Sequence, residues 1–146
     1  TIRDCIESGK EVVVQVDKEE RGTKGAALTT YLKLAGKYLV LLPKNPNTGG
    51  ISRRLEGNDR LNAKKMLDAL NIPEKMSVIL RTSGLNTSKE TLEWDMNYLI
   101  QIYENIVENS VLKKAPYLVY EESSMLARII RDYRFEKKIR KNTFTY

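Results

Sequence analysis

Arg81 and Thr82 directly follow a short apolar run, residues 76–80, whose length and composition predict a buried strand. An arginine guanidinium is a planar fork of donors that suits bidentate contact with phosphate, and the threonine adds a hydroxyl and a backbone amide beside it. A strand end is also a rigid mount for a binding site. The pair therefore predicts a phosphate site, although a solvated charge at a strand end is the commoner explanation when spacing alone is considered.

Other cations lie in segments that are predicted to be loops. Lys18 and Lys24 flank a charged turn, and Arg53 and Arg54 lie between glycines. Such residues can contact phosphates as charges, which adds affinity without selecting a sequence. Two alternatives stay open: the lysines belong to an ordinary solvated loop, and the arginines pair with nearby acidic side chains.

The composition excludes several kinds of site. With no histidine and a single cysteine, Cys5, the chain lacks the residues for a self-contained zinc site, a Cys-His nucleophile or a Ser-His-Asp triad. Asp17, Glu19 and Glu20 have cationic neighbours, which disfavours a metal cluster there. The net charge of +6 favours a polyanionic partner.

The first part of the chain is predicted to form strands. A β-branched run at residues 11–16 predicts a strand, and residues 26–43 predict a hairpin that turns at Ala35, Gly36 and Lys37. Helical spacing also fits part of residues 26–43, so a helix stays open on the residues alone. A long glycine-containing loop with a short central strand is expected at residues 44–57.

Helices and strands alternate in the second part. A helix capped by Asp59 is expected to bury Leu61, Met66, Leu67 and Leu70. The strand at residues 76–80 follows. Thr87 and Glu90 have capping-box spacing, and the helix they begin has a long apolar stripe. The stripe consists of Leu92, Met96, Leu99, Ile100, Tyr103, Ile106 and Val107.

Trp94, Tyr98 and Tyr103 are interpreted as residues of the core and its rim. After the long helix we expect a strand at residues 117–120 and a final helix capped by Ser123 or Ser124. The inner face of that helix would carry Leu126, Ile129, Ile130 and Tyr133. This order of elements predicts an α/β protein of the α+β kind, with helices packed on a mixed sheet.

Several ordered blocks of the sequence resemble the ribonuclease E/G family. The blocks are residues 17–46, residues 49–57 (GGISRRLEG), residues 79–84 (ILRTSG), Trp94 with Asp95, and residues 131–133. They occur in the family's order and at nearly its spacing, from about residue 11 to residue 133. The resemblance is specific because long ordered blocks coincide, and it favours strands for the hairpin.

The resemblance implies a division into two parts. Residues 1–25 would be the end of an OB-fold RNA-binding domain, contributing its last strand. Residues 26–146 would be an RNase H-like subdomain with flanking helices. Because the sequence starts at Thr1 and no catalytic subdomain can be located in it, we expect a fragment of a longer cytoplasmic protein.

The resemblance also implies roles for individual residues. Arg81 and Thr82 match the pair that senses an RNA 5′-monophosphate in the family, and the correspondence extends to Gly36 and Val40 of the hairpin. Lys18 and Lys24 match the position where the family's OB-fold channel contacts single-stranded RNA. With this likeness the phosphate site becomes the preferred interpretation of Arg81.

The family cleaves RNA with magnesium-bound carboxylates and joins its protomers through a zinc link, and neither feature can be located in this chain. We therefore expect an RNA-binding, 5′-end-sensing part of a single-strand-specific endoribonuclease, inactive alone. Its partners would be RNA, the remaining catalytic domain and further protomers, without membrane insertion. A structural scaffold with a vestigial pocket is the alternative, and an independent nuclease is disfavoured by the scarcity of converging acids.

Overall fold

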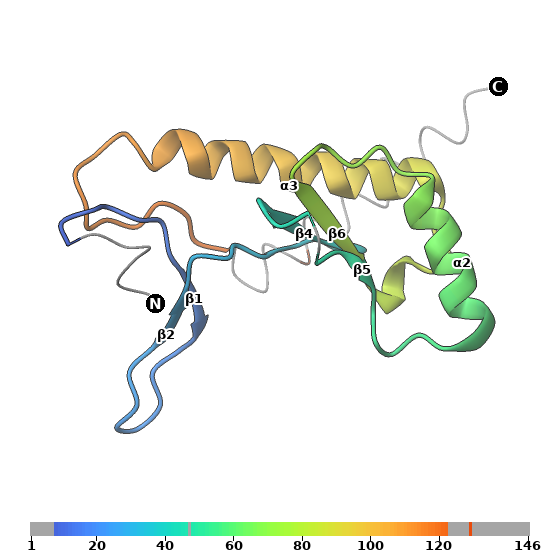
Figure 1. Cartoon of the computed structure of the whole chain (residues 1–146), viewed down its shortest axis with the longest axis horizontal. Helices are drawn as coiled ribbons and strands as arrows, with labels where there is room; N and C mark the ends of the chain where they lie inside the picture. Colours follow the sequence, from blue (N-terminus) through green and yellow to red (C-terminus); the bar gives the residue numbers. More distant parts are fainter. Residues whose placement is uncertain (1–7, 47, 123–128, 130–146) are drawn as a thin grey trace.

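Two β-sheets organise the chain, which a computed structural model describes at residues 8–46, 48–122 and 129. The smaller sheet pairs β1 with β2, and the larger has the strand order β3-β4-β6-β5 (Figure 1). The strands are β1 (Gln15–Lys18), β2 (Ala27–Thr29), β3 (Leu34–Ala35), β4 (Leu39–Pro43), β5 (Gly50–Ile51) and β6 (Met76–Leu80). The helices are α2 (Gly57–Asp68) and α3 (Lys89–Asn109), and the 3-10 turn η1 (Thr82–Gly84) follows β6. The prediction of an α+β fold with a mixed sheet is confirmed.

The larger sheet is mixed because its strands run in both directions. β3 pairs antiparallel with β4, and β4 with β6, whereas β5 pairs parallel with β6. The hairpin predicted at residues 26–43 is confirmed around its turn, where β3 pairs with β4 and the amide of Gly36 donates to the carbonyl of Leu39 at 2.8 Å. Its first arm is shorter than predicted, because residues 27–29 form β2 and pair with β1 in the smaller sheet. Ile51 pairs with Leu80 at the carboxyl ends of β5 and β6. The segments that follow these two strands therefore start at the same edge of the sheet.

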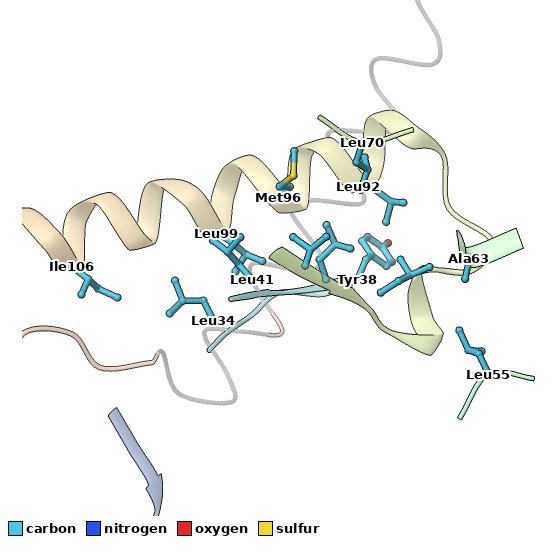
Figure 2. Close-up of a cluster of buried hydrophobic side chains, with 13 residues drawn as sticks. Leu34, Tyr38, Leu41, Leu55, Ala63, Leu70, Leu92, Met96, Leu99 and Ile106 are labelled. Carbon is cyan, nitrogen blue, oxygen red and sulfur yellow. The ribbon is translucent and has the colours of Figure 1, made fainter. Parts of the chain in front are cut away.

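Helix α3 packs on the larger sheet and closes the main core (Figure 1). Alternate strand residues turn toward the helix, so Leu39, Leu41 and Leu80 are completely buried. Side chains spaced three and four residues apart meet them from α3. These are Leu92, Met96, Leu99 and Ile106 (Figure 2). Each such leucine contributes about 1.5–3 kcal/mol by burial, and this layer fixes α3 against the strands.

The edges of the predicted α3 stripe are less buried than its centre. Ile100 and Tyr103 pack against the core while partly exposed, as does Tyr98. Val107 and Trp94 are exposed. A helix turns about 100° per residue, so a position next to a fully buried one lies on the flank of the stripe. The prediction of burial is therefore wrong for Val107, and Trp94 lies outside the core.

Helix α2 packs beside β5. Ala63 is completely buried, and Met66 and Leu67 pack against the core at helical spacing from it. Leu70, just beyond the end of the helix, is itself buried. Leu61, predicted on this face, is 60% exposed. It lies two residues, or about 200°, from Ala63 around the helix and so on the opposite side. The N-cap is Glu56 rather than Asp59, which instead places a carboxylate in the first turn, where the helix dipole favours it.

The start of α3 also differs from the predicted capping box. Ser88 is the N-cap, and its hydroxyl accepts a hydrogen bond from the amide of Thr91 at 3.3 Å. The hydroxyl of Thr87 donates to the carbonyl of Gly84 at 2.7 Å, which directs this side chain toward the preceding turn. Glu90 lies in the first turn, where hydrogen bonds from its own backbone amide and from the Ser88 hydroxyl lower the pKa of its carboxyl.

The β1–β2 hairpin extends away from α3 and the larger sheet (Figure 1). Its pairing runs from Gln15 opposite Thr29 to Lys18 opposite Ala27. The strand predicted at residues 11–16 is therefore displaced toward the carboxyl side, since residues 11–14 have no partner strand. The hairpin includes residues on both sides of residue 25, the expected boundary between the OB-fold and RNase H-like parts, and that division stays a prediction.

The prediction of a strand at residues 117–120 is wrong. These residues pair with neither described sheet, and without a neighbouring ladder an extended segment is not a strand. Leu118 is exposed and Val119 packs against the core. The predicted final helix lies outside the described residues except for Ile129, which is exposed instead of facing inward. Within the described ranges, no helix is both long and apolar enough to cross a bilayer.

Candidate functional site

Arg81 directly follows β6 and is held at two points by the β3–β4 turn. Its backbone amide donates to the carbonyl of Tyr38 at 2.9 Å, which continues the β4–β6 ladder by one step. Its guanidinium donates through Nη1 to the carbonyl of Gly36. The residue is nevertheless exposed, and in the described part of the chain its guanidinium makes one hydrogen bond, which leaves the other N–H donors for a ligand. An anchored guanidinium with free donors is well suited to binding a phosphate group.

The η1 turn continues this edge. Thr82 is exposed beside Arg81, and the hydroxyl of Ser83 donates to the carbonyl of Lys37 at 2.8 Å. Gly84 is buried against the hairpin. A Cβ at Gly84 would lie 2.7 Å from Leu80 Cδ1 and 3.2 Å from the carbonyl oxygen of Tyr38. Glycine at this position therefore permits η1 to pack closely against Leu80 of β6 and the β3–β4 turn.

Asp95 of α3 lies beneath the same turn and is only 4% exposed. Its Oδ1 accepts from the amide of Lys37 at 3.1 Å, and its Oδ2 accepts from the amides of Tyr38 and Leu39, both at 2.8 Å. A buried carboxylate needs such donors, because an unsatisfied charge in the interior is very unfavourable. A Cβ at Gly36 would lie 2.5 Å from Asp95 Oδ2, so the turn can sit this close only with glycine there.

The structure brings the predicted residues Gly36, Val40, Arg81 and Thr82 to one part of the larger sheet. Gly36 contacts Arg81 directly through its carbonyl. Val40 lies on β4, is half-buried and pairs with Ile79, two residues before Arg81. Their proximity is a property of the fold, whereas their role in binding stays a prediction.

A second cation belongs to the same turn. The Nζ atom of Lys37 lies 5.3 Å from the centroid of the Tyr38 ring, within the range of a cation–π contact. Lys37 also supplies the carbonyl that Ser83 binds. The turn and the end of β6 thus contribute one cationic side chain each, which favours an anionic ligand at this edge.

The predicted RNA-contacting lysines lie elsewhere. Lys18 ends β1, and Lys24 forms a backbone bridge with Arg21 near the tip of the β1–β2 hairpin, with both N–O distances 3.0 Å. Both lysines are exposed. Since this hairpin extends away from the larger sheet (Figure 1), the structure does not bring Lys18 and Lys24 together with Arg81.

Arg53 and Arg54 come after β5 and are exposed. The amide of Ser52 donates to the carbonyl of Leu80 at 3.1 Å, which ties this segment to the end of β6. The two arginines therefore follow the same sheet edge as Arg81. Among the described residues, neither arginine forms an ion pair with a nearby carboxylate, so the alternative interpretation as a paired cluster is not supported.

Sequence reasoning gave no role to Asp95 or Ser83. Asp95 belongs, with Trp94, to one of the blocks that resemble the family. A usable signal was nevertheless present: Asp95 falls on the inward face of α3, between Leu92 and Leu99 of the apolar stripe. An acidic residue at such a position predicts a buried, hydrogen-bonded carboxylate. In the described ranges no three Cys, His, Asp or Glu side chains gather in a way that could hold a metal ion.

The geometry is that of an α+β domain with an anchored, solvent-facing arginine at a strand end. Residues 33–143, which include the turn, Arg81 and α3, match the family model described as the Ribonuclease E/G family. The chain belongs to the ribonuclease E/G family.

Curated relatives agree with this assignment. The chain is 50% identical over 132 residues to Ribonuclease E of Escherichia coli (strain K12), covering 90% of this chain and 12% of the relative. It is 51% identical over 132 residues to Ribonuclease E of Buchnera aphidicola subsp. Schizaphis graminum, covering 90% and 14%. Ribonuclease G of Escherichia coli is 32% identical over 136 residues, covering 91% and 28%. The chain thus spans only a small part of the length of these relatives.

Proposed function

We propose that this chain binds the 5′ end of RNA, with Arg81 and Thr82 as ligands of a 5′-monophosphate and Gly36 and Val40 bordering the bound end. The observation that carries the proposal is the anchoring of Arg81. One N–H of its guanidinium is used by the carbonyl of Gly36, and the exposed remainder is available to an anion. Fixing the side chain before binding reduces the entropy that binding must remove.

A terminal phosphate differs from a terminal hydroxyl in charge and in acceptor number. A phosphate monoester at neutral pH carries about −1.5 to −2 charges and three strong acceptor oxygens, as phosphorylated side chains do. Arg81 and the hydroxyl of Thr82 would donate to these oxygens, and a 5′-hydroxyl offers neither the charge nor the acceptors. The site would therefore favour 5′-monophosphorylated RNA over RNA with a 5′-hydroxyl.

Other cations would contact the RNA backbone. Arg53 and Arg54 follow the same sheet edge as Arg81, and Lys18 and Lys24 lie on the projecting hairpin. All four are exposed. Contacts of this kind add affinity that falls with salt concentration and carry little sequence preference.

The intact protein, in this proposal, is a ribonuclease, because the relatives are named Ribonuclease E and Ribonuclease G. We propose further that it is a single-strand-specific endoribonuclease of RNA processing and decay. This chain would supply recognition and not cutting, since the proposed contacts are cations, a hydroxyl and backbone groups. Magnesium-dependent cleavage and a zinc link between protomers would belong to other parts of the protein. The OB-fold end at residues 1–25 and the RNase H-like part at residues 26–146 belong to the same proposal.

The test compares two RNAs of one sequence that differ only at the 5′ end, a monophosphate in one and a hydroxyl in the other. Binding to the intact protein is measured for the wild type and for Arg81→Ala. The wild type is expected to bind the monophosphate form more tightly, by about tenfold or more, because charge-assisted hydrogen bonds contribute about 1.5–3 kcal/mol. Arg81→Ala should remove this preference.

The matched control is Arg60→Ala, which removes an exposed arginine from α2, outside the proposed contacts. It should leave the ratio of the two affinities unchanged. Equal binding of both RNAs by the wild type would contradict the proposal and would favour a structural scaffold whose basic surface serves contacts between domains or protomers.

A further inference from the structure

Three successive peptide groups connect Asp95 to the segment that carries Arg81. The N–H of each peptide group donates to the Asp95 carboxylate. The C=O of each group accepts a hydrogen bond from Arg81 or Ser83 on the opposite side. In the first, the amide of Lys37 binds Asp95 and the carbonyl of Gly36 accepts from the Arg81 guanidinium. In the second, the amide of Tyr38 binds Asp95 and the carbonyl of Lys37 accepts from the Ser83 hydroxyl.

The third peptide group completes the pattern. The amide of Leu39 donates to Asp95 Oδ2 at 2.8 Å, and the carbonyl of Tyr38 accepts from the backbone amide of Arg81 at 2.9 Å. These three peptide bonds are trans, which places N–H and C=O on opposite sides of each group. When Asp95 draws the three N–H groups inward, the three carbonyls must point outward.

We infer that Asp95 is the positioning residue of the proposed phosphate site: its buried carboxylate orients the turn so that three carbonyls hold Arg81 and Ser83. The inference rests on the proposed function, because it concerns the same arginine. Asp95 acts through the turn, whose peptide groups occupy its carboxylate oxygens.

Two physical effects make the arrangement useful. A carboxylate that accepts from an N–H polarises that peptide group, and the carbonyl on its other side becomes a stronger acceptor. The Gly36 carbonyl therefore holds the Arg81 guanidinium more firmly. Because a free arginine side chain has many rotamers, ordering it in advance makes its donors available to a phosphate at lower entropic cost.

The close approach of Gly36 to Asp95 supports the same conclusion. Gly36 has no Cβ, and one placed there would meet Oδ2 at 2.5 Å and Oδ1 at 2.7 Å. The carboxylate cannot easily move aside, since both oxygens are engaged by amides. The position of the carboxylate and the conformation of the turn are therefore mutually dependent.

A purely structural role for Asp95 makes a different prediction. If the carboxylate only attached α3 to the sheet, its loss would weaken binding of every RNA in step with the loss of folded protein. If it positions Arg81, its loss would act on the preference for a 5′-monophosphate while the affinity for 5′-hydroxyl RNA stays constant.

The test uses Asp95→Asn in the intact protein, because asparagine has nearly the same shape but one of its two terminal atoms cannot accept from an amide. The affinity ratio for 5′-monophosphate and 5′-hydroxyl RNA is expected to fall by about tenfold, toward that of Arg81→Ala. In the double variant with Arg81→Ala, Asp95→Asn should cause no further fall, as expected for residues that act together.

Two further variants keep the test decisive. Glu104→Gln removes an exposed carboxylate from the same helix and should leave the ratio unchanged. Ser83→Ala removes one exposed hydroxyl bond to the turn and should lower the ratio partially, even if Asp95→Asn does not fold.

The outcomes separate the two proposals. A folded Asp95→Asn protein that keeps the full monophosphate preference, while Arg81→Ala loses it, overturns the positioning role alone. If Asp95→Asn does not fold, an undiminished preference of Ser83→Ala for 5′-monophosphate RNA overturns the positioning role. If the wild type shows no preference, the proposed function fails and the positioning role fails with it. If Asp95→Asn lowers the ratio of the affinities for 5′-monophosphate and 5′-hydroxyl RNA while the affinity for 5′-hydroxyl RNA is unchanged, both the proposed function and the positioning role are supported.

Discussion

The Arg81 guanidinium donates a hydrogen bond to the carbonyl of Gly36, a residue 45 positions earlier in the sequence. The bond joins the end of a buried strand to the turn of a neighbouring hairpin. It converts a long, exposed side chain into one with a defined direction. The proposed recognition of an RNA 5′ end depends on this contact more than on the presence of a positive charge alone.

Replacement of Arg81 by lysine separates charge from geometry. Lysine keeps the positive charge but offers no planar fork, so it cannot hold the Gly36 carbonyl and a phosphate as arginine can. We expect Arg81→Lys to lower the ratio of the affinities for 5′-monophosphate and 5′-hydroxyl RNA by about tenfold. The affinity ratio of the two RNAs measures the effect. A wild-type ratio in this variant would show that charge alone is sufficient.

Replacement of Gly36 by alanine should disturb both the turn and Asp95. The added Cβ would lie 2.5 Å from Asp95 Oδ2, and overpacking of this kind costs about 1–3 kcal/mol. The free energy of unfolding should fall by that amount, with a parallel loss of the monophosphate preference. The control is Gly25→Ala, where a Cβ would meet nothing within 4 Å. If both substitutions are equally neutral, the close approach at Gly36 has no energetic consequence.

The attachment of α3 to the sheet can be tested at Leu99, which is 1% exposed. Leu99→Ala should lower the free energy of unfolding by about 2–5 kcal/mol, because it removes buried apolar area and leaves a cavity. Leu61→Ala on α2 is the matched control, since Leu61 is 60% exposed and should change stability by about 0.5 kcal/mol or less. Denaturant unfolding of both variants provides the comparison. Similar losses would be inconsistent with the described core.

The lowered pKa of Glu90 leads us to expect that the stability of the fold depends on pH. Its carboxyl has a pKa below the ordinary value of 4.5 because its own backbone amide and the Ser88 hydroxyl stabilise the charged form. A lowered folded-state pKa means that the charged carboxylate stabilises the fold at neutral pH. This contribution is lost as the pH falls below the ordinary value and through the folded one.

Thermal unfolding of wild type and Glu90→Gln at neutral pH and at about pH 3 tests this expectation. At neutral pH the wild type should be slightly more stable than Glu90→Gln. This difference in stability between the two proteins should shrink in acid. The exposed Glu104 provides a control on the same helix through Glu104→Gln. A difference that grows in acid would contradict the predicted sign.

Local sequence was sufficient for the main elements. Strand-forming residue types on both sides of Gly36 favoured the β3–β4 hairpin, the family resemblance decided against a helix there, and the short apolar run before Arg81 predicted β6. Helical spacing from Leu92 to Ile106 predicted α3 and most of its buried face. These features could be predicted because they depend on side-chain periodicity and turn chemistry over a few neighbouring residues.

Element ends were less predictable, because capping depends on which of several adjacent polar groups reaches the backbone. Thr87 and Ser88 are both acceptable caps by type, and the turn at Gly84 engages Thr87 and leaves Ser88 for the helix. The strand expected at residues 117–120 failed for a similar reason. A strand requires a neighbouring ladder, and residue types in one segment do not specify its neighbour.

The sequence by itself determined that an arginine and a threonine follow a buried strand and that a glycine lies in a hairpin turn. Only the tertiary structure decided that the Arg81 guanidinium reaches Gly36 and that Asp95, from a helix distant in sequence, binds the other side of the same turn. Such contacts depend on the packing of α3 and β6 around the hairpin. Hydrogen bonds between distant segments have no local sequence period, so only the folded arrangement specifies them.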